Sequence, residues 1–171
     1  MSEKVQSNLM LLVLAAAGCG GSLRGGFIPP TYSCAPMQQY ESPPIGSPTG
    51  NVQVRIENHA GSRVEVESLC VILDRTRALP FTEAGASSWV WQGPLEASGP
   101  HELALYSYVR HYSVLDTTLF DVRSSRLVVP STTSDLNVLG RIEPGPDRTM
   151  EVNGHVIREA PRVTWSEPAS F

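Results

Sequence analysis

Hydrophobic and polar positions alternate along most of the chain after residue 50, which predicts β-strands. In "VQVRIE", residues 52–57, Val52, Val54 and Ile56 share one face and polar residues share the other, as in a half-buried strand. Residues 64–73, "VEVESLCVIL", begin in the same way and then become continuously apolar, which is typical of a central strand. Similar patterns predict further strands over residues 87–92, 101–114, 118–129 and 136–143.

Turn-forming residues punctuate these segments. Residues 58–62, "NHAGS", favour a hairpin connection, and Asn153-Gly154 between two β-forming runs is the strongest short hairpin signal in the chain. No stretch keeps a helical spacing of apolar residues. The pattern therefore predicts an all-β fold for residues 51–171, an antiparallel β-sandwich of immunoglobulin-like architecture.

The residues before this domain have a different character. Residues 1–8 are polar, residues 9–18 are apolar, and small side chains precede Cys19, which is the layout of a secretory signal peptide over residues 1–18. The apolar run is too short to cross a bilayer, since a spanning helix needs about 17–25 residues. Residues 19–50 are rich in Gly, Pro and Ser and are expected to form a disordered tether.

The sequence "LAAAGC", residues 14–19, resembles the lipobox of bacterial lipoproteins. The resemblance implies that Cys19 is lipidated and becomes the mature amino terminus, so that membrane lipid is a partner through acylated Cys19. Gly20 after it favours the outer membrane over the inner membrane, again by resemblance. An ordinary secretory signal cleaved near Ala17 and a plain amphipathic tail are the alternatives.

Two cysteines remain after Cys19. Cys34 and Cys70 can form a disulfide in an exported protein, which would tie the tether to the domain. Alternatively, Cys70 lies among apolar residues, where a free cysteine behaves as a small buried hydrophobe. The sequence leaves both states open.

Composition excludes some partners and offers few candidate sites. A net charge of −4, with Lys4 as the only lysine, argues against nucleic acid as a partner. No nucleophile elbow, phosphate loop or metal-ligand spacing of histidines occurs, so we expect no catalytic residue, cofactor or metal. Aromatic residues at period two form either a sugar-stacking platform or part of the core: Trp89, Trp91, Tyr106, Tyr108 and Tyr112.

Three segments, "SLCVILDRTRALPF", "GPLEASGPHELALYSYVRHYSV" and "FDVRSSRLVV", resemble a poorly characterised group of predicted lipoproteins from GC-rich Gram-negative bacteria. Some members carry the label dihydrolipoamide acyltransferase. That activity needs a lipoyl-bearing lysine and a histidine followed by Asp-Gly, whereas the chain after Lys4 has no lysine and His111 is followed by "YSVLD". We therefore expect a membrane-anchored, non-enzymatic envelope lipoprotein that contacts envelope proteins or glycans. The alternative is an envelope hydrolase whose site is assembled only by folding.

Overall fold

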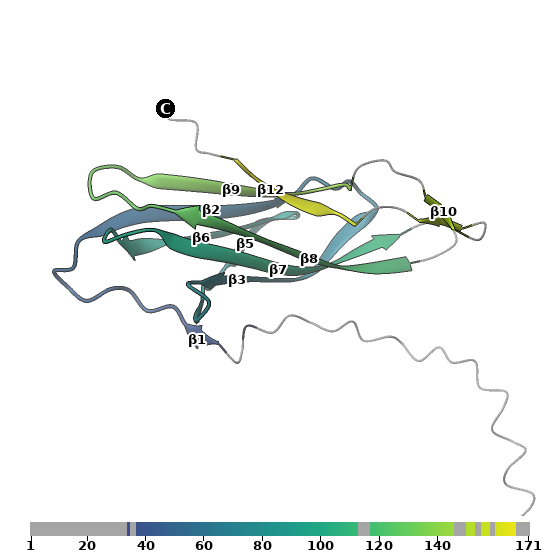
Figure 1. Ribbon diagram of the computed structural model, residues 1–171. Helices are drawn as coiled ribbons and strands as arrows, with labels where there is room; N and C mark the ends of the chain where they lie inside the picture. Colours follow the sequence, from purple (N-terminus) through teal and green to yellow (C-terminus); the bar gives the residue numbers. More distant parts are fainter. Residues whose placement is uncertain are drawn as a thin grey trace, which may run out of the picture.

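The computed structural model describes residues 34, 37–112, 117–145, 150–152, 155–157 and 160–166, and these residues form strands and no helix (Figure 1). Two sheets pack face to face, which confirms the predicted all-β sandwich. The strands are β1 (Gln38–Gln39), β2 (Thr49–Asn58), β3 (Val64–Leu73), β4 (Arg77–Ala78), β5 (Thr82–Gly85), β6 (Ser88–Glu96), β7 (His101–Tyr112), β8 (Thr117–Val128), β9 (Leu136–Glu143), β10 (Met150–Val152), β11 (His155–Ile157) and β12 (Arg162–Ser166).

The first sheet has the order β1-β4-β3-β7-β8 and the second sheet has the order β12-β9-β2-β6-β5. Most neighbours are antiparallel, but β2 pairs with β9 and β1 pairs with β4 in parallel. Hydropathic alternation carries no information on strand direction, so these two pairings were not predictable from it. The strands β10 and β11 form a separate antiparallel pair whose register, Val152 opposite His155, brackets the predicted Asn153-Gly154 turn; these two turn residues lie outside the described residues.

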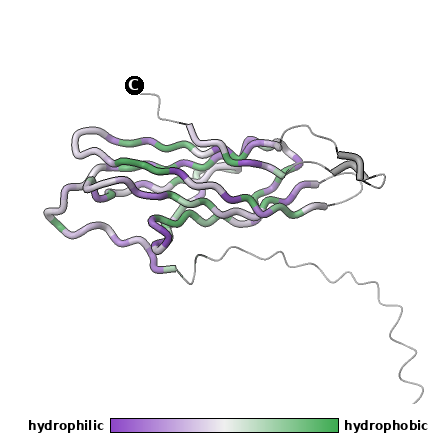
Figure 2. Tube along the Cα trace, viewed as in Figure 1, coloured by the Kyte–Doolittle hydropathy of each residue, from purple (hydrophilic) through white to green (hydrophobic). Residues whose placement is uncertain are grey.

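The core lies between the two sheets, where apolar side chains of both inner faces meet. Val52, Val54 and Ile56 of β2 are fully buried, as the alternation predicts, and they face fully buried residues of β7 such as Leu103 and Leu105. Figure 2 shows the resulting alternation of hydrophobic and hydrophilic positions along the strands. Burying one large apolar side chain stabilises the fold by about 1.5–3 kcal/mol, so this contact is the main source of stability.

Strand β3 departs from regular pairing by one residue. Val66 pairs with Val109 of β7, whereas Ser68 pairs with Tyr108, which leaves Glu67 as the extra residue of a β-bulge. The bulge places Val66 and Leu69, three positions apart, on the same inner face of the sheet. Ser107 is fully buried beside it, and its hydroxyl donates a 2.7 Å hydrogen bond to the Ser68 carbonyl.

One long edge of the sandwich is closed by a tryptophan. Trp165 of β12 donates an indole hydrogen bond of 2.8 Å to the hydroxyl of Ser124 in β8, which joins the second sheet to the first. Gly140 of β9 makes room for this packing: a Cβ atom there would lie 2.8 Å from Ile56 Cδ1 and 2.9 Å from the Trp165 ring. A side chain at this position would displace the tryptophan from the edge that it closes.

The sequence assigns residues 37–50 to the tether, but β1 and Tyr40 in this segment are held against the sandwich and Thr49 and Gly50 begin β2. A disulfide joins Cys34 to Cys70 of β3, with Cα atoms 5.8 Å apart. Tyr40 donates its amide hydrogen to the Ala78 carbonyl and its hydroxyl hydrogen to the Pro94 carbonyl, and its ring packs edge-on against Trp91. These contacts lie far from Tyr40 in sequence, so composition alone could not indicate them.

We expect the disulfide to contribute measurably to stability. It closes a loop with a sequence separation of 36, for which chain entropy predicts about 2–4 kcal/mol. Urea denaturation of Cys34→Ser should show a free energy of unfolding lower by this amount, and reduction of the wild-type protein should lower it equally. Reduction should leave the variant unchanged; equal denaturation midpoints for the wild type and Cys34→Ser would contradict the prediction.

Candidate functional site

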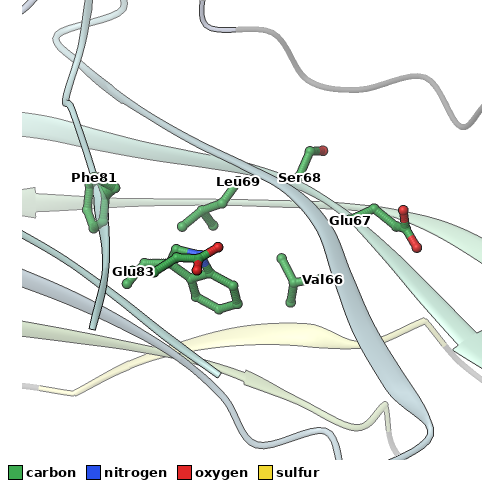
Figure 3. A pocket seen from close by; sticks show the side chains of 7 residues that line it. Val66, Glu67, Ser68, Leu69, Phe81 and Glu83 are labelled. Atoms are coloured by element: carbon green, nitrogen blue, oxygen red, sulfur yellow. The ribbon is translucent and has the colours of Figure 1, made fainter. Parts of the chain in front are cut away.

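A hollow of about 310 Å³ opens at the edge of the sandwich opposite the one that Trp165 closes. We call it the bulge groove, because the bulged part of β3 forms one wall and the segment that leads from β4 through β5 to β6 forms the other (Figure 3). Its lining residues are Val66, Glu67, Ser68, Leu69, Phe81, Glu83 and Trp89.

The two sheets contribute different parts of the groove. On the first sheet, the bulge keeps Val66 and Leu69 on the inner face on either side of Glu67. On the second sheet, Glu83 pairs with Trp89, so both side chains lie on the same face of neighbouring strands, the face toward the core. Phe81, just before β5, adds an aromatic side chain to the hollow, and Glu83 lies between Phe81 and Val66 in the view of Figure 3.

The three carboxylates near the groove differ in their surroundings. Glu67 forms a 2.8 Å ion pair with Arg110 and points away from the hollow in Figure 3. Glu65 accepts a 2.6 Å hydrogen bond from the Tyr112 hydroxyl. Glu83 is exposed and, within the part of the chain that the structure describes, forms no ion pair, so its charge is available to a ligand.

A second polar cluster lies where the β3–β4 turn meets the start of β7. Asp74 and Arg75 both have positive φ, 49° and 62°, which makes a tight hairpin turn of the kind that suits strand twist. The turn is fastened to Glu102, whose amide donates 2.9 Å to Asp74 Oδ1 and whose carboxylate accepts 2.9 Å from Arg75 Nε. Beside it, His101 Nδ1 lies 2.7 Å from Asp74 Oδ2.

The geometry of His101 argues against its use as a catalytic base. Its Nε2 lies 2.8 Å from the Glu96 carbonyl oxygen, so both ring nitrogens face acceptors that carry no hydrogen. Only the doubly protonated imidazolium can donate to both. Burial alone lowers the pKa of His101, but the hydrogen bonds to Asp74 and Glu96 and the nearby carboxylates outweigh it, and the pKa is raised overall.

The five aromatic residues of the expected sugar platform are divided among three places. Trp91 is buried in the core, and Trp89 lines the bulge groove. The tyrosines lie on the outward face of β7, where the Arg123 guanidinium is 5.8 Å from the Tyr106 ring centroid and that of Arg110 is 6.0 Å from Tyr112. They do not form one platform for a sugar chain.

The structure bears on only some of the other expectations from the sequence. Residues 1–18 and Cys19 lie outside the described residues. Within the described ranges, no three or more His, Cys, Asp or Glu side chains gather as metal ligands, and no helix is long and apolar enough to span a bilayer. Comparisons with protein-family models, curated proteins and solved structures find no significant match to this chain.

The raised pKa of His101 predicts how stability depends on pH. A histidine whose pKa is higher in the folded state stabilises the fold fully below its unfolded pKa of about 6.5 and loses this contribution as pH rises through the folded value. The free energy of unfolding of the wild type, relative to His101→Gln, should therefore fall between about pH 6 and the raised folded pKa. Urea denaturation across this range measures it.

The variant Asp74→Asn is the control for the cause of this dependence. It removes the carboxylate that favours the imidazolium, so the histidine should titrate at lower pH in 15N spectra of the imidazole. Two results would refute the imidazolium assignment. One is a His101 titration whose midpoint pH is the same in Asp74→Asn as in the wild type. The other is a free energy of unfolding that depends on pH in the same way in the wild type and in His101→Gln.

Proposed function

We propose that this chain is an exported lipoprotein that is held at a membrane of the cell envelope by acylated Cys19, and that its β-sandwich is a binding module for envelope proteins. The signal-like residues 1–18 and the lipobox-like residues 14–19 support the anchor. The resemblance to predicted envelope lipoproteins supports the same assignment. The residue after the anchor, Gly20, favours the outer membrane.

The observation that carries the proposal is the disulfide between Cys34 and Cys70. Disulfides form and persist in oxidising compartments outside the cytoplasm and are rare inside it. The bridge joins the sandwich to Cys34, which lies within the residues 19–50 that would lead to the anchor. An exported location and a lipid anchor at Cys19 explain all three cysteines of the chain with one pathway.

The anchor would be firm for a physical reason. Each buried methylene of an acyl chain yields about 0.8 kcal/mol, so one chain holds a protein marginally and two hold it stably. Lipoprotein processing attaches at least two chains to the cysteine. An acidic chain with a net charge of −4 gains nothing from anionic headgroups, so the anchor would decide the location alone.

A binding role fits the site better than catalysis. Asp74 and His101 come closest to a catalytic arrangement, but they hold a turn in place. Both ring nitrogens of His101 are already used, one with Asp74 and the other with the Glu96 carbonyl. The bulge groove combines aliphatic and aromatic side chains with polar groups, among them the exposed carboxylate of Glu83, and this mixture is suited to recognition. A hydrolase would need a nucleophile or an activated water beside a base with a free nitrogen or oxygen.

The anchor can be tested by metabolic labelling with a clickable fatty acid followed by membrane fractionation. The wild type should take up the label and stay in the membrane pellet after a high-salt wash. Cys19→Ala should lose both properties. The Cys34→Ser/Cys70→Ser double variant is the matched control: it removes the other two cysteines and should keep the label.

Two results would refute the lipoprotein assignment. One is a wild-type protein without label. The other is a Cys19→Ala protein that remains in the membrane pellet after the salt wash, because the anchor would then lie elsewhere.

A further inference from the structure

Arg141 lies on the outer face of the second sheet, in a strand with neighbours on both sides. Its strand β9 lies between β12 and β2. The side chain points away from the core, because Gly140 and Ile142 on either side of it in sequence are buried. The register places Glu57 of β2 and Thr164 of β12 beside Arg141 on the same face.

The guanidinium of Arg141 has no hydrogen-bond partner. Its Nε–H group is buried and donates to nothing, the one side-chain group in this state among the described residues. Its Nη groups form no hydrogen bond either and are not buried, so a ligand can reach the end of the guanidinium. Buried polar groups of native proteins are nearly always paired, so this arginine is an exception that a ligand can explain.

The carboxylate beside Arg141 is already engaged. Glu57 Oε1 lies 2.8 Å from Arg55 Nε, and Glu57 Oε2 lies 2.7 Å from His59 Nε2. The hydrogen bond with His59 also lowers the pKa of Glu57, so this carboxylate stays ionised. Both oxygens are thus held by other side chains, and the charge of Arg141 is left for a group from outside the chain.

The charges on this part of the face favour one negative charge over two. Among the described residues, Arg55, Arg141 and Arg162 stand against Glu57 and Glu143, an excess of one positive charge in a chain whose net charge is −4. A dianion would also be repelled by the two carboxylates. The planar fork of arginine matches the two oxygens of a carboxylate with parallel hydrogen bonds. A carboxylate therefore fits both the charge and the geometry.

We propose that Arg141 is the centre of a carboxylate-binding site for an acidic side chain of a partner protein. The end of its guanidinium donates to the ligand oxygens, and the Thr164 hydroxyl donates to one of them. An outward sheet face suits the surface of a protein, and the site adds a recognition surface to the binding module proposed above. It lies away from the bulge groove, which opens between the sheets, and it stands whether or not Cys19 is acylated.

The test follows the arginine Nε–H resonances in proton–15N correlation spectra of the full chain, purified in detergent, at about pH 6, where carboxylates are ionised. The probe is the tripeptide acetyl-Gly-Glu-Gly-amide, which carries one carboxylate, added at constant ionic strength. The Arg141 resonance, assigned by its loss in Arg141→Lys, should shift to saturation with a dissociation constant of about 10 mM or lower. The glutamine analogue of the probe should give no saturable shift. The resonance of Arg77, an exposed arginine of the first sheet, is the internal control.

Variants of the neighbouring ion pair test the charge argument. Glu57→Gln removes a repelling carboxylate and should raise the affinity about threefold, an effect typical of exposed charge pairs. Arg55→Gln frees Glu57 to pair with Arg141 and should lower the affinity about threefold. A purely structural role of Arg141 would not produce these opposite changes. Arg77→Gln removes a positive charge elsewhere and should leave the affinity unchanged.

Four results would overturn the proposal. They are an Arg141 resonance that does not saturate, equal shifts of Arg141 and Arg77, tighter binding of sulfate than of the tripeptide, and weaker binding by Glu57→Gln. Tighter binding of free acetate than of the tripeptide would overturn the protein origin of the carboxylate. Cys19→Ala should bind the probe as the wild type does, so failure of the anchor and failure of this site give different results.

Discussion

Two apolar sheet faces can exclude water only if they cover each other as far as both edges of the sandwich. Along the edge formed by β8 and β12, this is achieved by Trp165, which reaches Ser124 of the other sheet over the bare backbone of Gly140. Along the opposite edge, Tyr40 links the β1–β4 end of the first sheet to Pro94 of β6, and the bulge groove opens farther along that edge, beside β3 and β5. The two edges therefore differ: Trp165 closes the one formed by β8 and β12, and the other leaves a hollow beside the bulge of β3.

The groove follows from the way β3 keeps its apolar residues inside. If Glu67 were paired regularly instead of forming a bulge, strict alternation from Val66 would turn Ser68 inward and Leu69 outward. The bulge restores the inward phase for Leu69 and the residues after it, and the hydroxyl of the buried Ser107 satisfies the Ser68 carbonyl at the irregular step. The local break in the ladder is offset by burial of the second half of the strand, and the hollow lies beside this break.

The sequence predicts the long strands well because their signal is local. The alternation of β2 and β7 defines the inner face of each sheet, and the fully buried residues are those that the pattern indicates. The phase shift between Val66 and Leu69 is also visible in the sequence and is the one local signal for the groove. The short strands β4, β5 and β12, the parallel pairing of β2 with β9, and the contact of His101 with Asp74 have no such signal, because each depends on which segments meet after folding.

The attachment of the amino-terminal segment connects these features mechanically. In the proposed lipoprotein, a pull on the anchor at Cys19 passes through Cys34 and the disulfide to Cys70 instead of entering the sandwich at β2. Cys70 belongs to β3, the strand that carries the bulge. Its register with β7 extends from Val64 to Leu73, so a long antiparallel ladder shares the load. Successive side chains of a strand point to opposite faces, so Cys70 lies on the outer face of β3 and Leu69 beside it lies on the inner face, at the bulge groove. The disulfide therefore holds the amino-terminal segment on the face of the sheet that lies away from the groove.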